Sequence, residues 1–267
     1  MQLRILHRTA YTYEEPVKYT AQALRLTPRR DGSQRTLSWA IHAPGRRTEQ
    51  VDAHGNITHL LTLEEPHRDM SIVVSGTVEV SSEEEMLRHE SHLSPLAYLA
   101  STPLTTPNEE MALLAREHMS GDGPLRDRFY RLAAAVHERV RYQKGATSVD
   151  DSAAIALANG QGVCQDQAHV FVACCRLAGI PARYVSGYVC GNGSGESASH
   201  AWVDAWVDES KAWLGIDVTN LSPAGPSHCR LAVGRDYLDA APVRGVRRGG
   251  GREVMDVSVT ATTFAGQ

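Results

Sequence analysis

The stretch that decides the fold runs from residue 160 to residue 181 and reads GQGVCQDQAHVFVACCRLAGIP. After its first turn it is apolar nearly all round, which predicts a central, buried helix that begins at Cys164. Gly179 is a suitable C-terminal stop for this helix, and Pro181 prevents it from resuming. Three strands are predicted to follow, at about 182–189, 199–207 and 212–218. A helix followed by successive strands favours a domain in which helices pack on an antiparallel sheet.

Cys164 is predicted to lie in the first turn of this helix, where a thiol acquires special chemistry. Unpaired backbone N–H groups at a helix start carry partial positive charge, which stabilises a thiolate. The same groups, including the N–H of Cys164 itself, are placed to stabilise an oxyanion that forms when the sulfur attacks a carbonyl. Cys164 is therefore the candidate nucleophile.

The candidate base is His200, which lies on the polar and aromatic face of its strand, while the other face is purely Ala and Val. The linker 208–211 is short enough for a hairpin, so this strand and the next should be antiparallel neighbours. If Val207 lies opposite Ala212, then Asp217 is the diagonal neighbour of His200; a shift of two residues would place the pair directly opposite. Either register predicts a hydrogen bond by which Asp217 orients the imidazole.

The residues alone leave open whether the helix start reaches His200. The alternatives are core packing for Cys164 beside a structural Asp–His pair, and a metal site. Plausible metal ligands are Cys164, His169, His200, Asp204 and Asp217. Compact ligand spacing such as His-Glu-x-x-His or paired Cys-x-x-Cys is absent, so the metal site is the weaker hypothesis.

The pattern along the chain predicts an N-terminal all-β domain over residues 1–81, because short alternating runs are broken there by turn residues. Pro16 is expected to end the first strand. Residues 82–108 are acidic and proline-containing, and we interpret them as a linker. Residues 109–267 are expected to form the catalytic core with a C-terminal extension. In that part we predict helices after Asn108 and at about 125–142, a closing strand at 254–260, and a solvated hairpin loop at 247–252.

Composition excludes several classes of function. Hydrophobic residues make up 42% and charged residues 22%, which is an ordinary globular balance, and the net charge of -4 gives no general attraction to nucleic acid or acidic membranes. The first residues lack the pattern of a secretory signal, and no long apolar span occurs. Five cysteines, an odd number without zinc-like pairs, are expected to be reduced, with Cys174 and Cys175 acting as small hydrophobes. We therefore expect a cytoplasmic protein.

Several segments together resemble the bacterial transglutaminase-like superfamily. They are GVCQD (162–166), AGIPARYVSGY (178–188), SHAWV (199–203) and DVTN (217–220), with YTY (11–13), PV (16–17), LRLTPR (24–29), DAHGN (52–56), GRDY (234–237) and PVRG (242–245) outside the core. The resemblance covers nearly the whole chain and implies an α+β protein, with an N-terminal β-sandwich or barrel-like domain before a papain-like transglutaminase core. It also implies a catalytic triad in which Cys164 is the nucleophile, His200 the general base and then acid, and Asp217 the orienter. Gln167 and Val218 depart from the family pattern. We expect these two departures to affect packing and not the three catalytic residues.

The resemblance implies attack of the thiolate on a peptide or amide carbonyl, with a thioester intermediate and no cofactor. Water as the acceptor would make the chain a cysteine peptidase or amidase, and a primary amine would make it a transglutaminase-type acyltransferase. We favour hydrolysis, because similar bacterial proteins are commonly regarded as cysteine proteases. A further alternative is a non-catalytic peptide-binding module. The presence of all three catalytic residues argues against it. The expected partner is a peptide or protein substrate, independence from calcium is expected because no EF-hand-type loop occurs, and the oligomeric state is left open.

Overall fold

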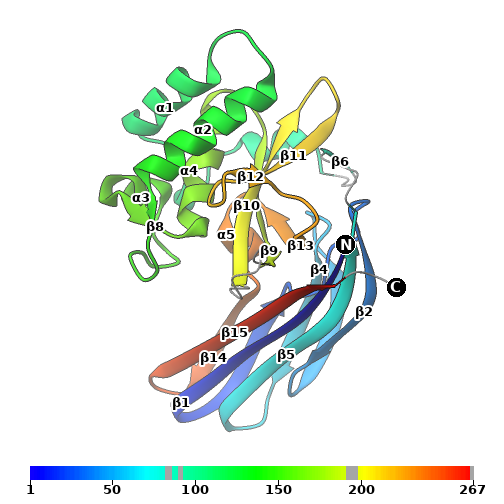
Figure 1. Ribbon diagram of the computed structural model, residues 1–267. Coiled ribbons are helices and arrows are strands. Elements are labelled where there is room, and N and C mark those ends of the chain that lie inside the picture. The colour runs from blue at the N-terminus through cyan, green and yellow to red at the C-terminus, as the bar shows by residue number, and fades with distance from the viewer. Residues whose placement is uncertain (82–85, 90–92, 191–197, 265–267) are drawn as a thin grey trace.

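A computed structural model describes residues 1–81, 86–89, 93–190 and 198–264. Helices form one layer, a smaller antiparallel sheet lies in the middle, and a large curled sheet forms the far side (Figure 1). One hydrophobic core lies between the helices and the smaller sheet, and a second lines the large sheet and includes Tyr188 and Leu231 of the smaller one. The expected α+β class with an N-terminal β domain is therefore confirmed.

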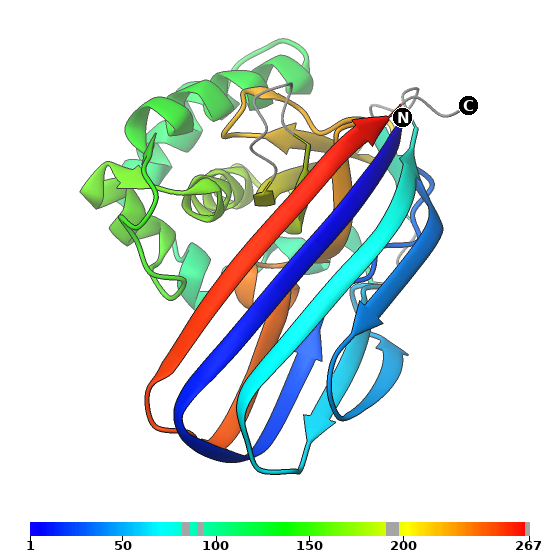
Figure 2. The same cartoon turned by 60° about the horizontal axis from the view of Figure 1, so that its bottom comes forward.

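The large sheet is built around one long, bent strand. Its members are β1 (Gln2–Leu24), β2 (Gln34–His42), β3 (Arg46–Val51), β4 (Ile57–Leu63), β5 (His67–Val80), β14 (Val243–Gly249) and β15 (Glu253–Phe264). The first half of β1 pairs with β5 and β15, while its second half pairs with β4 and β14. Figure 2 shows β1, β5 and β15 side by side, with the sheet turning over at their lower end. The two halves of β1 thereby belong to two parts of one curled sheet.

We expected Pro16 to end the first strand, but the strand continues past it. Pro16 lies where the pairing of β1 with β5 shifts register, between Thr12 and Val17. Proline lacks an N–H and is tolerated where a ladder is interrupted, so the strand bends there and continues to Leu24. Strand β3 was not predicted, because all six of its residues are exposed and show no alternation.

The C-terminal extension that we expected after the catalytic core returns to the large sheet, and it contains the predicted strand at 254–260 within β15. Residues 243–264 form β14 and β15, which pair antiparallel along one edge of β1. That edge would otherwise present a long row of unpaired backbone groups, so the chain returns to cover it. The basic segment 247–252 is solvent-facing for the most part, but Arg247 and Arg248 lie in β14 rather than in a loop.

The smaller sheet holds the predicted strands. Its members are β6 (Met86–Arg88), β9 (Ala182–Val189), β10 (Ala198–Val207), β11 (Ala212–Asp217), β12 (Ser222–Pro223) and β13 (His228–Gly234), in the order β12-β11-β10-β9-β13 with β6 beside β11. Two further short strands, β7 (Arg141–Tyr142) and β8 (Gln161–Gly162), pair in parallel. The bounds of β9, β10 and β11 agree with the prediction to within one residue.

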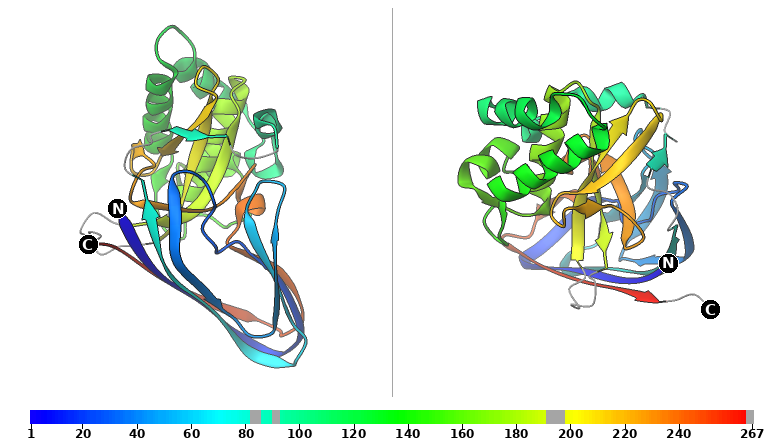
Figure 3. Two further views of the ribbon diagram at one scale, coloured as in Figure 1. Left: turned by 90° about the vertical axis from the view of Figure 1, so that its right-hand side faces the viewer. Right: turned by 45° about the horizontal axis from the view of Figure 1, so that its top comes forward.

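Helices cover one side of this sheet, as the two views of Figure 3 show. They are α1 (Glu109–Met119), α2 (Leu125–Arg139), α3 (Ala153–Asn159), α4 (Cys164–Leu177) and the single turn α5 (Tyr237–Ala240). Helix α4 contacts β9 and β10 directly and carries buried residues on every side, as predicted. None of the helices in the described ranges combines the length and apolar character that crossing a bilayer requires.

The segment that we interpreted as a linker packs on the core where it is described. Residues 82–85 and 90–92 lie outside the described residues. Between and after them, β6 adds an edge to the smaller sheet, and two 3₁₀ turns occur at Pro95–Leu99 and Pro103–Thr105. Tyr98 in the first turn is fully buried, because its ring packs edge-on against Trp213.

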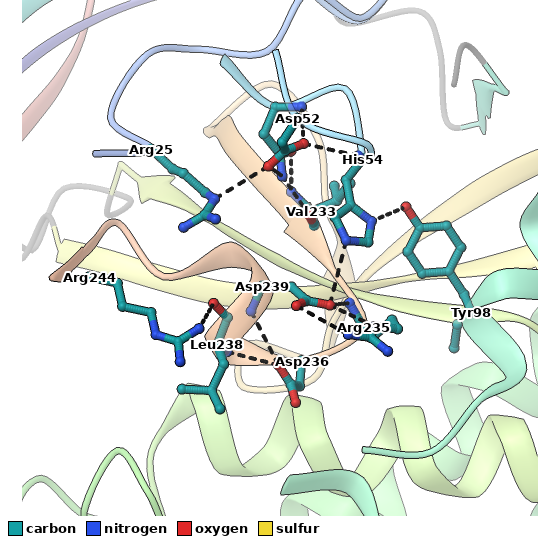
Figure 4. Close-up of polar contacts among 12 residues, drawn as sticks. Arg25, Asp52, His54, Tyr98, Val233, Arg235, Asp236, Leu238, Asp239 and Arg244 are labelled. Atoms are coloured by element: carbon teal, nitrogen blue, oxygen red, sulfur yellow. Dashed lines mark hydrogen bonds and ion pairs between the residues drawn. The ribbon is translucent and has the colours of Figure 1, made fainter. Parts of the chain in front are cut away.

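The large sheet is fastened to the smaller one by the loop that follows β3. Asn56 of this loop is fully buried; its amide nitrogen donates to the Val233 carbonyl at 2.8 Å, and its oxygen accepts from the Val233 N–H at 2.8 Å. Asp52 in turn accepts a 3.0 Å hydrogen bond from Asn56. Figure 4 shows the same junction, where His54 reaches Tyr98 and Asp239. The segment 52–56, which carries part of the family resemblance, therefore contacts Val233 and Asp239, which lie on either side of the segment 234–237.

Candidate active site

Cys164 is the first residue of α4, and its backbone position is fixed by the carboxylate of Asp166, two residues later in the same turn. Asp166 accepts hydrogen bonds from the Val163 N–H and the Thr147 hydroxyl, both at 2.7 Å. A Cβ atom at Gly162 would lie 2.6 Å from an oxygen of this carboxylate, so glycine is required for the close approach. The helix start therefore presents the thiol in a defined place, beside N–H groups that have no acceptor within the helix.

Cys164 differs from the other four cysteines in its exposure. It is partly exposed and free, whereas Cys174, Cys175, Cys190 and Cys229 are free and buried. Burial raises the pKa of Cys174 to about 12 and that of Cys190 to about 11, and it raises the pKa of the remaining two as well. Cys174 and Cys175 thus behave as the small apolar residues that we expected.

His200 and Asp217 meet as the strand pattern predicts. Val207 lies opposite Ala212, which is the first of the two registers considered. His200 Nε2 donates to Asp217 Oδ2 at 2.8 Å, and Asp217 is fully buried. Burial alone would lower the pKa of His200, but hydrogen bonds with Asp217 and Cys164 outweigh it and raise the pKa from 6.5 to about 10. The imidazole is therefore protonated near neutral pH.

The fold joins His200 to Asp217, and the influence of Cys164 on the pKa of His200 indicates that the start of α4 lies near this pair. His200 donates a hydrogen bond to Asp217, and Cys164 is among the groups that raise the pKa of His200. This arrangement can perform nucleophilic attack and proton transfer from one group of side chains.

Two further residues hold Asp217, and we did not predict either of them. Asn220 donates its backbone N–H to Asp217 Oδ1 at 3.0 Å and its side-chain amide to Oδ2 at 2.7 Å. His228, at the start of β13, donates from Nε2 to the same Oδ2 at 3.0 Å. Burial alone would raise the pKa of Asp217, but the hydrogen bonds with His200 and His228 outweigh it and hold the pKa well below its usual range. Asp217 is therefore an anion.

The metal hypothesis is not supported by the arrangement of its ligands. His169 and Asp204 lie elsewhere, since His169 accepts from the Tyr237 N–H and Asp204 pairs with Arg183 and Arg230. Within the described ranges, the group at ligand spacing consists of His200, Asp217 and His228, whose ligand atoms lie within 4.8 Å of one another.

The surroundings of His228 disagree with a role as a metal ligand. A histidine that binds a metal through one nitrogen usually donates a proton from the other to an acceptor. His228 Nδ1 instead accepts from the Gly225 N–H at 3.2 Å, so coordination through Nε2 would leave the ring with no proton on either nitrogen. The three side chains fit a hydrogen-bonded network better than a metal site.

Comparison with known proteins places this site in a family. The model of the Transglutaminase-like superfamily matches residues 113–218, and that of the Bacterial transglutaminase-like N-terminal region matches residues 3–79. An uncharacterized protein of Mycobacterium leprae is 31% identical over 288 residues, which cover 99% of both chains. One of Mycobacterium bovis is 30% identical over 293 residues, which cover 98% of this chain and 93% of the relative.

A solved structure shares the whole fold. The crystal structure of a protein of Cytophaga hutchinsonii, described as a "Putative Cysteine Protease", superposes with a TM-score of 0.81 over 100% of this chain and 92% of the other, at 22% sequence identity. At this identity the likeness shows the fold alone. Together with the matches along both parts of the sequence, it establishes that the chain belongs to the transglutaminase-like superfamily and carries the bacterial N-terminal region of that family.

Proposed function

We propose that this chain is a thiol enzyme that cleaves peptide or amide bonds through a thioester on Cys164, with water as the acceptor. The observation that supports the proposal is the hydrogen bond between His200 and Asp217, together with the electrostatic influence on His200 of Cys164 at the start of α4. The description of the Cytophaga protein as a cysteine protease favours hydrolysis over amine transfer. Cys164, His200 and Asp217 are the proposed nucleophile, general acid and base, and orienting carboxylate.

In the first half-reaction, the Cys164 thiolate attacks the carbonyl carbon and forms a C–S bond. The N–H groups at the start of α4 stabilise the oxyanion. When the C–N bond breaks, the His200 imidazolium gives its proton to the departing amine and becomes neutral. Asp217 keeps the imidazole in place throughout, because it accepts a hydrogen bond from Nε2–H and leaves the other nitrogen free to act.

In the second half-reaction, neutral His200 takes a proton from water, and the resulting hydroxide attacks the thioester carbon. The C–S bond then breaks and the sulfur leaves as a thiolate beside the imidazolium that has just formed. The acid is released and the resting ion pair is restored. A primary amine in place of water would give a new amide instead of an acid, and the experiment below separates these products.

Alkylation by iodoacetamide followed by mass spectrometry tests the nucleophile. We expect Cys164 to be labelled ahead of the four buried cysteines, and His200→Ala to slow this labelling at pH 7. His42→Ala, which changes an exposed histidine on β2, is the matched control and should leave the rate unchanged. Preferential labelling of another cysteine would overturn the proposal.

The acceptor is tested with a panel of peptide esters and amides in ¹⁸O-labelled water that also contains a primary amine. Incorporation of ¹⁸O into the released acid, lost in Cys164→Ala, supports hydrolysis. An amine adduct as the main product would instead assign amine transfer to the site. Turnover that survives in Cys164→Ala would contradict both reactions.

A further inference from the structure

Asp217 is shared by two histidines from different strands. His200 of β10 and His228 of β13 donate to the same oxygen, Oδ2, at 2.8 and 3.0 Å. His200 also interacts with Cys164, whereas the ring of His228 is enclosed, with Trp202 packed edge-on against it at 5.1 Å between ring centroids. The second histidine is thus an internal part of the site that the proposed reaction does not use.

We propose that His228 is a positioning residue that limits the negative charge Asp217 presents to His200 and so sets the pH at which His200 loses its proton. The inference rests on the proposed function, since that proton is the one given to the departing amine. It is carried by the hydrogen bonds around His228.

The surroundings of His228 fix which nitrogen carries its proton. The Gly225 N–H can only donate, and it points to Nδ1 at 3.2 Å. Nδ1 is therefore an acceptor, and the proton of the neutral ring sits on Nε2, which faces the Asp217 carboxylate. The Ser227 hydroxyl, also 3.2 Å from Nδ1, is free to rotate and can donate to the same atom. His228 is thus held as a permanent donor to Asp217.

Within the described residues, the groups that contact His200, Asp217 or His228 come from a few elements. Helix α4 brings Cys164 to His200, β11 brings Asp217 to both histidines, and Asn220 adds two neutral donors to the carboxylate. Trp202 packs on both rings, being stacked on His200 at 6.2 Å and set edge-on to His228, and the two histidine rings lie 6.3 Å apart between centroids. Arg230, on β13 with His228, lies over the Trp202 ring at 5.6 Å and is paired with Asp204 and Asp31.

The energetic consequence follows from sharing one oxygen. Each hydrogen bond to an ionised carboxylate offsets part of the negative charge of the carboxylate. With three donors on Oδ2, less negative charge is therefore left to stabilise the His200 imidazolium than with two. If the His228 donor is lost, Asn220 still holds both oxygens in place. The carboxylate then acts more strongly on His200, which should keep its proton to higher pH.

The experiment follows the proton on His200 through alkylation of Cys164 with iodoacetate. This reagent is an anion, so the imidazolium attracts it and the rate falls when His200 loses its proton. We expect the midpoint of that fall to move up by about one pH unit in His228→Leu, the size of one charge-assisted hydrogen bond. His228→Gln keeps an N–H near the position of Nε2 and should restore the wild-type midpoint. Equal midpoints in wild type and His228→Leu, or a shift of equal size in the Gln variant, would overturn the inference.

A measurement on the wild-type protein keeps the test decisive if His228→Leu does not fold. Long-range ¹H–¹⁵N spectra of the histidine rings should show His228 with its proton on Nε2 alone at pH 7, and His200 protonated on both nitrogens. A proton on Nδ1 of His228 would refute the inference by itself. Failure of wild-type Cys164 to react preferentially would refute the proposed function instead, so the two failures are distinguishable.

Discussion

The side-chain oxygen of Gln167 accepts a 2.7 Å hydrogen bond from the Thr219 hydroxyl. Gln167 lies in the first turn of α4, fully buried, and its amide nitrogen donates to the Val140 carbonyl at 2.7 Å. Thr219 follows Asp217 by two residues. This bond therefore connects the turn that carries Cys164 to the segment that carries Asp217. From the sequence, Gln167 was expected only to change packing, because it departs from the family pattern.

Removal of the Thr219 hydroxyl should loosen this tie. Thr219→Val keeps the shape of the side chain but leaves the Gln167 oxygen buried without that donor, which costs about 1–3 kcal/mol in the free energy of unfolding. We also expect slower alkylation of Cys164, since the helix start is less firmly held against Asp217. Urea unfolding and the iodoacetamide rate measure the two effects. Thr219→Ser retains the hydroxyl and is the control; a loss as large as that of the Val variant would argue against the hydrogen bond as the cause.

The stability of the protein should fall in mild acid because of two buried neutral histidines. Burial lowers the pKa of His7 to about 4 and that of His169 to about 3, whereas an unfolded histidine has a pKa of 6.5. As pH falls below 6.5, the unfolded chain binds protons that the folded chain does not, so stability is lost. From pH 7.5 to 5 each histidine costs about 2 kcal/mol.

His7→Gln tests this pH dependence. His7 contacts the Tyr188 hydroxyl at 2.7 Å and the Thr9 hydroxyl at 2.8 Å, and glutamine can also donate and accept there without titrating. The loss of stability between pH 7.5 and 5 should shrink by about 2 kcal/mol in the variant, while all other titrating groups cancel in the comparison. Urea denaturation at both pH values gives the difference. If wild type and variant lose the same free energy, His7 is not a source of the acid sensitivity.

The parts of the fold that the sequence predicted are those set by local pattern. The bounds of α4 and of β9 to β11 follow from periodicity, from Gly179 and Pro181 after the helix, and from a short hairpin linker. The association of β14 and β15 with β1 could not be found in this way, because their partner lies more than 200 residues earlier in the sequence. An alternating run indicates a strand but not which strand it will join.

The same division holds within the candidate site. The His200–Asp217 contact was predictable, because the two strands form a hairpin and side-chain parity fixes their faces. His228 lies only eleven residues beyond Asp217, yet its contact depends on the path of the chain through β12 and the following turn. Asn220 lay within a quoted motif but had no assigned role, because its amide finds Asp217 only through the shape of that turn.

The junction between the two sheets should depend strongly on Asn56. Its side chain pairs with both backbone groups of Val233 and also contacts Asp52 and Arg29. Asn56→Ala would leave the Val233 N–H and carbonyl buried without these partners, each at a cost of about 1–3 kcal/mol, so we expect a loss of about 3 kcal/mol in the free energy of unfolding. Gln50→Ala, on the exposed strand β3, is the control and should change stability by less than about 0.5 kcal/mol. Urea unfolding monitored by circular dichroism measures both variants. If Asn56→Ala were no less stable than Gln50→Ala, the sheets would have to be held together mainly by their shared apolar core around Tyr188 and Leu231.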